Sequence, residues 1–273
     1  MATKDGLLER AVGNAATAKE LPGSSLRGRT AVVTGSGRNI GRAIALSLAD
    51  QGARVVVNGH QDQSAVDSVV DEIRSGGGEA LGVMADVGSD EDVRRLLATA
   101  AESLGPVDIV VSNVGIRRKQ PFLEITPQQW DEVLRTNLSA AFYLARHAIA
   151  SMQARRGGRI VLISGFDGFW GQVTHRAHNI TAKAGLHGLA MALAREFGPD
   201  GITVNTVAPG AIDTIRDWTQ YTHQQRAQLE REIPLGRYGK PEEVAAACEL
   251  LCSDRGGFIS GQVIHVNGGH YMY

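Results

Sequence analysis

A glycine-rich segment near the start of the chain has the residue types and spacing needed to hold a phosphate group. It runs from Thr34 to Gly41 with the sequence TGSGRNIG and follows the short apolar segment Thr30–Thr34. Glycines let a backbone approach a ligand closely, and a helix that begins there offers oriented N–H groups and positive potential. Because the segment follows a predicted strand and opens a predicted helix, it indicates nucleotide binding more strongly than a structural turn.

A second group of residues with chemical potential lies between positions 175 and 183. His175 and His178 are one helical turn apart, and Lys183 follows five residues after His178. Imidazole titrates near neutral pH, so either histidine could donate a proton, although a histidine at a helix start is more often a surface residue. Two histidines without a third ligand make a poor zinc site, so we predict no metal centre.

The elements that position these residues alternate along the chain. Seven short segments rich in β-branched residues predict strands at Thr30–Thr34, Arg54–Asn58, Ala80–Ala85, Val107–Ser112, Arg159–Ser164, Ile202–Val207 and Gln262–Val266. Segments with helical spacing separate them, at Ile40–Gln51, Ser64–Ser75, Asp90–Leu104, Thr126–Arg155, Ala177–Phe197, Ile215–Arg231 and Pro241–Cys252. Uninterrupted apolar strands between amphipathic helices predict a parallel sheet covered on both faces. The expected fold class is α/β, a doubly wound, Rossmann-type, seven-stranded parallel sheet in a single domain.

The composition excludes several classes of partner. The 273 residues carry 28 basic and 29 acidic side chains without a basic stripe, so we expect no nucleic-acid partner. No apolar run approaches the roughly 20 residues that span a bilayer, so we expect no membrane insertion. Cys248 and Cys252 share a helix face and are expected to be packing residues. Together these features indicate a soluble, cytoplasmic protein.

The chain divides into an appendage and one domain. Residues 1–25 end in the helix-breaking sequence Pro22-Gly23-Ser24-Ser25 and are expected to form an N-terminal arm. Residues 26–273 are expected to form the Rossmann-type domain, because the alternating pattern begins at Arg29 and shows no second domain or internal repeat.

Several motifs in chain order resemble those of the short-chain dehydrogenase/reductase family, and within it the subgroup containing 3-oxoacyl-acyl-carrier-protein reductases. Thr34–Gly41 is similar to the family's TGxxxGxG, with Asn39 at the middle glycine position, and Asn tolerates left-handed backbone angles better than most residues. Further matches are Ala85-Asp86-Val87, Asn113-Val114-Gly115, Thr136-Asn137-Leu138, Ala182-Lys183-Ala184-Gly185, Pro209-Gly210 with Thr214, Gly261-Gln262 and Val266-Asn267-Gly268-Gly269. The resemblance spans residues 27 to 270 and implies an NAD(P)-dependent oxidoreductase that transfers hydride between a nicotinamide and a small-molecule carbonyl or alcohol.

The resemblance, together with the end of the second predicted strand, also implies a set of cofactor-binding residues. Asp86 matches an adenine contact, and Pro209-Gly210 with Thr214 matches the segment that meets the nicotinamide. The whole set is Gly35, Ser36, Arg38, Asn39, Ile40, Gly41, Asn58, His60, Asp86, Val87, Asn113, Gly115, Lys183, Pro209, Gly210, Ile212 and Thr214.

The end of the second predicted strand favours NADP over NAD. NAD enzymes of this fold usually place an acidic residue there, on the ribose 2′-OH. Here the strand ends Asn58-Gly59-His60, and the nearest carboxylate is Asp62. Arg38, with help from Asn58 or His60, could instead meet a 2′-phosphate.

Two of the four catalytic positions that the resemblance implies hold unexpected residues. Asn137 and Lys183 match the family's Asn and Lys, but its Ser position aligns with Gly165 and its Tyr position with Asn179. Glycine offers no side chain, and an amide cannot donate a proton near neutral pH. The ordinary reductase mechanism should therefore be severely impaired. The candidate catalytic residues are Asn137, Asn179, Lys183 and His178.

Three functions remain open from the sequence. The first is an oxidoreductase with a rebuilt acid, for which His178 or Tyr221 is a candidate. The second is a dinucleotide-binding subunit or sensor without catalysis. The third is a non-redox enzyme that uses Asp167, Arg176 and the histidines for acid–base chemistry. We expect the first, because the residues implied in cofactor binding are retained.

The sequence says less about the substrate and the partner subunits than about the fold and the cofactor. Phe166, Phe169 and Trp170 favour an apolar or ring-bearing substrate, or pack against the Ile215–Ile233 segment or another subunit. Arg117-Arg118-Lys119 could attract an anionic substrate, or could simply be solvated. The resemblance implies a homo-oligomer, a tetramer or a dimer.

Overall fold

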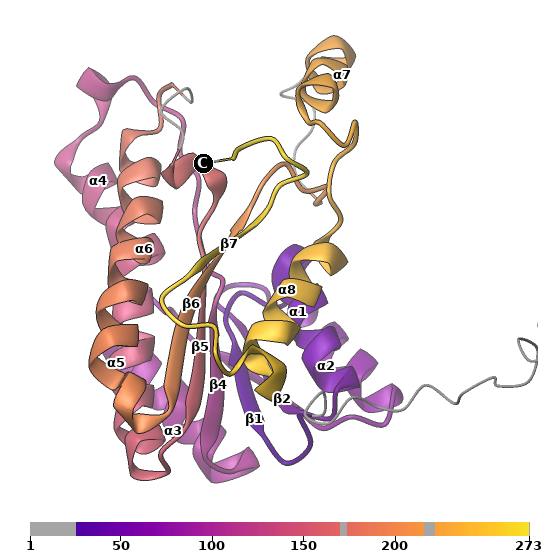
Figure 1. Ribbon diagram of the computed structural model, residues 1–273, viewed down its shortest axis with the longest axis vertical. Coiled ribbons are helices and arrows are strands. Elements are labelled where there is room, and N and C mark those ends of the chain that lie inside the picture. The colour runs from indigo at the N-terminus through magenta and orange to yellow at the C-terminus, as the bar shows by residue number, and fades with distance from the viewer. Residues whose placement is uncertain (1–25, 170–173, 216–221, 273) are drawn as a thin grey trace, which may run out of the picture.

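The fold is built on one parallel sheet. The computed structural model describes residues 26–169, 174–215 and 222–272 (Figure 1). The seven strands pair in the order β3-β2-β1-β4-β5-β6-β7, and every neighbouring pair is parallel. They are β1 (Thr30–Val33), β2 (Arg54–Gly59), β3 (Ala80–Met84), β4 (Val107–Ser112), β5 (Gly158–Ile163), β6 (Ile202–Pro209) and β7 (Val263–Val266). The predicted fold class, a Rossmann-type α/β sheet in a single domain, is confirmed.

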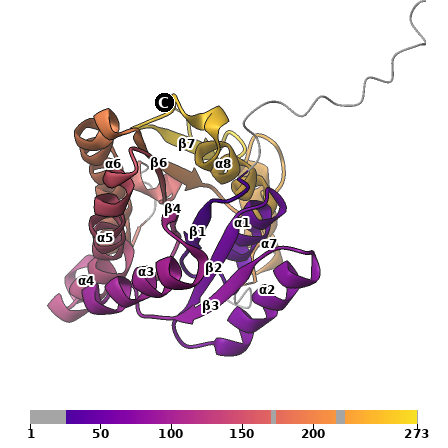
Figure 2. The ribbon, with the colours of Figure 1, turned by 90° about the horizontal axis from the view of Figure 1, so that it is seen from below.

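Helices cover both faces of the sheet (Figures 1 and 2). One face carries α1 (Asn39–Asp50), α2 (Gln63–Ser75) and α8 (Pro241–Cys252), and the other carries α3 (Asp90–Leu104), α5 (Ala140–Ala154) and α6 (Ala177–Phe197). Ala31 and Val33 of β1 belong to the first core and Val32 to the second, because successive side chains of a strand point to opposite faces. No helix in the described part of the chain has the length and apolar character needed to cross a membrane.

The two cysteines are packing residues, as predicted. Cys248 and Cys252 are free thiols on α8, fully buried in the first core. Burial raises the pKa of both thiols, that of Cys252 to about 12. Neither thiol is therefore ionised or reactive near neutral pH.

The helix predicted over Thr126–Arg155 is not one regular helix. It comprises α4 (Pro127–Leu134), a π-helical turn at Arg135–Ser139 and α5. A π turn is a wider turn that is often found at functional sites, and this one contains Asn137. The prediction was wrong in assuming uniform geometry, because the apolar spacing continues through the turn.

The helix predicted over Ile215–Arg231 begins later than expected. α7 spans His223–Glu232, and Thr222 caps it by accepting a hydrogen bond from the Gln225 N–H while the Gln225 side chain accepts one from Thr222. This reciprocal cap fixes the helix start. Ile215 is not helical. The expected N-terminal arm, Trp170 and Tyr221 lie outside the described residues.

Candidate functional site

The glycine-rich segment makes the tight crossing between β1 and α1 that a phosphate loop requires. Gly35 and Asn39 both have left-handed φ angles, +60° and +53°. Asn39 thus adopts the conformation anticipated for a residue in place of glycine. A Cβ at Gly41 would lie 2.3 Å from the Gly35 carbonyl oxygen and 2.6 Å from Asn113 Nδ2, so only glycine fits there.

The N-terminus of α1 is open to an anion. Its N-cap residue, Arg38, makes no side-chain capping bond, and its first turn holds no acidic residue. By contrast α2, α3, α4 and α7 are capped by the side chains of Asp62, Ser89, Thr126 and Thr222. Uncapped N–H groups and the positive end of the helix suit a phosphate. Together with the glycine crossing, they fit the pyrophosphate of a dinucleotide.

Three of the predicted cofactor residues hold this loop in place through hydrogen bonds. Ser36 and Asn58 are buried, and Ser36 Oγ donates to the Val33 carbonyl (2.6 Å) and accepts from the Asn58 N–H (3.0 Å). Asn58 Oδ1 accepts from the Gly35 N–H at 3.3 Å. Asn113 Nδ2 donates to the carbonyls of Thr34 and Gly35 at 3.0 and 3.2 Å. These bonds tie β2 and β4 to the loop at the point where the strand order reverses.

The side of the loop near β2 carries exposed basic side chains, and no carboxylate occupies the last residues of the strand. Arg38 and His60 are exposed. The Arg38 guanidinium makes no hydrogen bond or ion pair with the described residues. The first carboxylate after β2, Asp62, is engaged in capping α2 by accepting from the Ala65 N–H at 3.0 Å. The surroundings therefore suit a phosphate better than a ribose hydroxyl.

Asp86 lies after β3 as an ionised group. Burial alone would raise its pKa, but hydrogen bonds from Arg135 (3.0 Å) and the Gly88 N–H (2.9 Å), with the charges of Arg135 and His60, bring the pKa below its usual range. Sequence analysis missed Arg135. No local pattern could have found it, because 49 residues separate it from Asp86.

Lys183 marks the other end of the site. It comes from α6, and its Nζ donates to the Ile163 carbonyl at the end of β5 (2.8 Å). A Cβ at Gly115, after β4, would stand 3.3 Å from that Nζ and 3.6 Å from Asn137 Oδ1. Burial and then the charge of Arg117 lower the pKa of Lys183 to about 8, against the opposing effect of Asp167.

Two buried amides hold the segment after β4. Asn137 Oδ1 accepts from the Ile116 N–H (2.8 Å), and its Nδ2 donates to the Ile116 carbonyl (2.9 Å). Asn179 donates to the same carbonyl (2.7 Å) and accepts from the Arg118 N–H (3.1 Å). Both ends of each amide therefore bond to backbone. Asn179, at the position that the resemblance assigns to tyrosine, is 3% exposed.

Gly165 leaves space beside the end of β5. Among the described residues, a Cβ built there meets only the Pro209 carbonyl oxygen, at 4.0 Å. The preceding Ser164 is buried, and its Oγ lies 3.0 Å from His187 Nε2. Burial, together with the charges of His265 and Lys183, lowers the pKa of His187 to about 4.

The two histidines predicted as alternative acids have different surroundings. His175 is exposed, whereas His178 is fully buried. Burial lowers the pKa of His178. Nearby, Arg176 forms an ion pair with the buried Asp167 at 3.3 Å. Across the described ranges, no three His, Cys, Asp or Glu side chains are grouped so as to hold a metal ion.

The segment after β6 closes the site and contacts the phosphate loop. Pro209, Gly210 and Ile212 are buried, while Thr214 is partly exposed. Asn39 Oδ1 accepts from the Ile215 N–H (2.8 Å), and Asn39 Nδ2 donates to the Ile215 carbonyl (3.2 Å). The replacement of glycine by Asn39 thus ties the loop to the residue next to Thr214.

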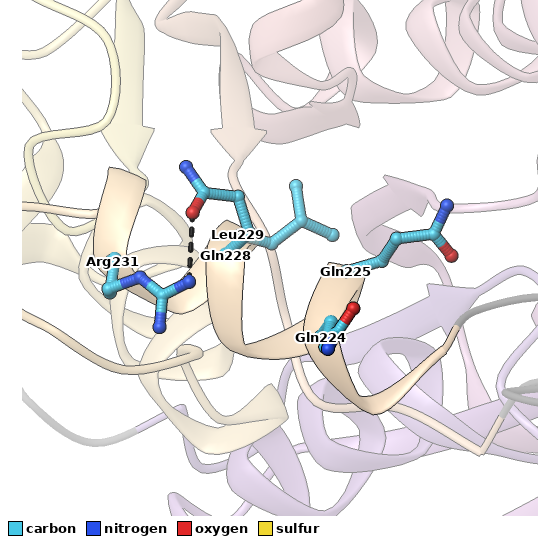
Figure 3. Close-up of a pocket in the computed structure, with 5 residues that line it drawn as sticks. All are labelled: Gln224, Gln225, Gln228, Leu229 and Arg231. Atoms are coloured by element: carbon cyan, nitrogen blue, oxygen red, sulfur yellow. Dashed lines mark hydrogen bonds between the residues drawn. The ribbon is translucent and has the colours of Figure 1, made fainter.

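A pocket of about 660 Å³ lies elsewhere, on α7 (Figure 3). It is lined by Gln224, Gln225, Gln228, Leu229 and Arg231, and Arg231 donates to Gln228 Oε1. It shares no residue with the cluster at the strand ends. Its single charged side chain and its amides offer no acid–base pair, so we place no chemistry there.

Comparison with known proteins agrees with this geometry. Residues 35–271 match a family model described as enoyl-(acyl carrier protein) reductase. The 3-oxoacyl-[acyl-carrier-protein] reductase FabG of Aquifex aeolicus is 41% identical over 90% of this chain and 98% of its own length. The same enzyme of Pseudomonas aeruginosa is 40% identical over 91% of this chain and 99% of its own length.

A solved structure from Beutenbergia cavernae shares the fold. It is provisionally assigned as an NAD(P)-dependent gluconate 5-dehydrogenase and holds NADP at low occupancy. It is 38% identical to this chain with a TM-score of 0.85, covering 90% of this chain and 98% of its own. The extent of these matches and the parallel sheet with its glycine crossing lead to one conclusion: the chain belongs to the short-chain dehydrogenase/reductase family.

Proposed function

We propose that the protein is an NADP(H)-dependent oxidoreductase that interconverts a small-molecule carbonyl and its alcohol. One observation carries the proposal. The N-terminus of α1 is uncapped and follows a tight crossing that only glycine at position 41 permits. This N-terminus and the group formed by Lys183, Asn137 and Gly115 lie near the carboxyl ends of neighbouring strands of the sheet. A dinucleotide has its phosphates and its nicotinamide at such separate places. When bound, it would supply the hydride, and the chain would orient it and manage the proton.

The proposed residue roles combine the family resemblance with the positions of these residues. The backbone of Gly35, Asn39, Ile40 and Gly41 would hold the pyrophosphate, with Ser36, Asn58 and Asn113 fixing the loop. Arg38 and His60 would meet the 2′-phosphate, and Asp86 and Val87 the adenine. Gly115, Lys183, Pro209, Gly210, Ile212 and Thr214 would surround the nicotinamide and its ribose. The relatives named as 3-oxoacyl reductases and the NADP-containing structure support this choice of cofactor.

The active site would be atypical, with Gly165 and Asn179 at the family's serine and tyrosine positions. We further propose a soluble, cytoplasmic homo-oligomer, a tetramer or a dimer. The exposed apolar side chains of Phe142, Met191 and Phe258 support association of subunits. Light scattering coupled to gel filtration measures the mass of the particle in solution directly, and the mass of a monomer would contradict the proposed oligomer.

A second function is favoured by one observation. The tyrosine position of the family holds Asn179, whose amide bonds to backbone through both ends and is not an acid near neutral pH. A subunit that binds the dinucleotide without turning over a substrate would need no acid at this position. Turnover of a carbonyl with bound NADPH distinguishes the enzyme from this sensor-like subunit.

Cofactor binding is tested by calorimetric titration with NADPH and NADH. We expect micromolar binding of NADPH and at least about tenfold weaker binding of NADH. Arg38→Ala should weaken NADPH binding by about tenfold or more and leave NADH binding unchanged, because the guanidinium meets only the 2′-phosphate. Arg42→Ala is the matched control, since Arg42 lies on the same helix but is paired with Glu72. Binding of neither dinucleotide would show the proposal to be wrong.

A further inference from the structure

Carbonyl reduction needs a proton donor, and the side chains near this site that could be considered first are either hydrogen-bonded to other groups or buried. Asn179 bonds only to the backbone of Ile116 and Arg118. His178 is fully buried. His187 lies against Ser164, and its pKa of about 4 leaves it without a proton to give at neutral pH. The donor has to be sought elsewhere among the described side chains.

Lys183 is a partly exposed ionisable group with hydrogen-bond donors to spare. Its Nζ has three N–H groups and makes one hydrogen bond with the described residues, to the Ile163 carbonyl. Gly115 stands on one side, where a Cβ would lie 3.3 Å from Nζ. The Lys183 side chain is partly exposed. The ammonium group therefore stands beside a position without a side chain and keeps two N–H groups that make no hydrogen bond with the described residues, and a substrate carbonyl could accept one of them.

The charged groups around Lys183 come from each element packed against it. Arg117 follows β4, Asp167 follows β5, and His187 lies one turn further along α6. Arg176 also belongs to this set through its ion pair with Asp167. Burial and Arg117 outweigh Asp167 and bring the pKa of Lys183 to about 8. A group that is protonated at neutral pH but close to its midpoint is an efficient general acid.

The geometry points to Lys183 as the catalytic residue that protonates the carbonyl oxygen directly, where other family members use a tyrosine. This inference rests on the proposed function. The Lys183 ammonium gives one proton to the carbonyl oxygen while the carbonyl carbon accepts a hydride from a reduced nicotinamide dinucleotide. The new C–H bond takes both hydride electrons, and the carbonyl π pair becomes the O–H bond. The positive charge lost by the amine is carried by the oxidised nicotinamide, and the amine regains its proton from water.

The first measurement needs no activity. Lysine labelled with ¹³C at Cε reports the titration of each amine by NMR, and Lys183→Arg assigns the signal. We expect the Lys183 signal of the free protein to titrate near the value of about 8. Lys119→Arg serves as the matched control, because Lys119 is exposed in the loop after β4.

The second measurement is single-turnover reduction of a carbonyl at saturating NADPH, across the Lys183 midpoint. The wild-type rate constant should fall about tenfold per pH unit above that midpoint, since the neutral amine cannot serve as the acid. Lys183→Arg keeps the positive charge but cannot release a proton, so its rate constant should fall about 100-fold. NADPH affinity, measured separately by calorimetry, allows each rate to be taken with the cofactor bound.

The outcomes separate the two proposals. A wild-type pH profile without a break at the NMR midpoint, or an undiminished rate in Lys183→Arg, overturns the role of Lys183. Turnover by Gly165→Ser/Asn179→Tyr of a carbonyl that the NADPH-bound wild type leaves unchanged also overturns it, because a restored tyrosine would then be required. Failure of the wild type to bind either dinucleotide instead overturns the proposed function itself.

Discussion

At position 41 the difference between hydrogen and methyl decides whether the phosphate loop can form. The carbonyl oxygen of Gly35 and the amide of Asn113 both approach the place where a side chain would begin. The same crossing brings the ends of β1 and β4 together through the bonds of Asn113. The glycine is therefore needed both for the fold of the loop and for its fit to a ligand.

Gly41→Ala should weaken NADPH binding at least tenfold or abolish it, and should lower the thermal midpoint. A Cβ 2.3 Å from the Gly35 carbonyl forces the loop to shift. Gly188→Ala is the control, because nothing lies within 4 Å of its Cβ position on α6 and alanine favours a helix by about 0.5–1 kcal/mol. Calorimetry and thermal denaturation measure both effects. Equal NADPH affinity in Gly41→Ala and wild type would refute the loop assignment.

Sequence alone predicted the residue-level features that depend on local conformation. The left-handed backbone of Asn39 was expected because asparagine tolerates it. The bonds of Asn39 to Ile215 and of Asp86 to Arg135 were not, because they join residues 176 and 49 positions apart. Such pairs become visible only when the sheet brings the strand ends together.

Among the elements, the π turn and α6 act together on one peptide group. The Ile116 carbonyl accepts from Asn137 in the π turn and from Asn179 in α6. The segment after β4 is thereby held between two helices at the edge of the site. This arrangement gives the Asn179 side chain a structural role that its position four residues before Lys183 did not suggest.

Asn137→Ala and Asn179→Ala should each destabilise the fold by about 1–3 kcal/mol, because each leaves one partly buried backbone N–H, of Ile116 or of Arg118, without its partner. The double variant should lose more than the sum, since the Ile116 carbonyl keeps one donor in each single variant and loses both in the double variant. Urea denaturation measures all three free energies of unfolding. Gln63→Ala, which removes an exposed side-chain bond to Asp67, should change little. Strict additivity of the two changes would argue against a shared acceptor.

At this scale the sequence predicted element types well and irregular geometry poorly. All seven strands were identified, because their β-branched segments are bounded by turns and alternate with helices. The π turn at Arg135–Ser139 was missed, since its residues continue the helical pattern. The start of α7 was also misplaced, although Thr222 and Gln225 form a capping box that the sequence displays.

For the whole molecule, histidines that burial makes harder to protonate link stability to pH. His178, His187 and His265 come from α6 and β7, and burial is the largest cause lowering each pKa. The rings of His187 and His265 both contact Phe169, with centroid distances of 4.1 and 4.9 Å. Protonation of these rings would place charge among apolar neighbours, so the folded state resists it.

The free energy of unfolding should therefore fall as the pH is lowered from 6.5 to 4. Over this interval the unfolded chain takes up a proton at His187 that the folded protein, with a pKa of about 4, does not. Above pH 6.5 this residue adds no slope, and below its folded pKa the loss is complete. The free energies of unfolding of wild type and His187→Gln, measured by urea denaturation, should change by amounts that differ by on the order of 3 kcal/mol across the interval. His60→Gln, at an exposed histidine, provides the comparison, and parallel wild-type and His187→Gln curves would contradict the linkage.

The paired amides of Asn39 and Ile215 have a consequence for how the molecule responds to a ligand. They join the turn at the start of α1 to the polypeptide that leaves β6, so a displacement of one must stretch the hydrogen bonds of the other. If an anion bound at the turn strengthens this contact, thermodynamic reciprocity requires that strengthening the contact raises the affinity of the turn for the anion by the same factor. The exchange of the Ile215 amide hydrogen with solvent should consequently slow or quicken when a dinucleotide binds, and Asn39→Gly should uncouple the two. We therefore expect a single asparagine to couple two segments that are far apart in the sequence when a ligand binds.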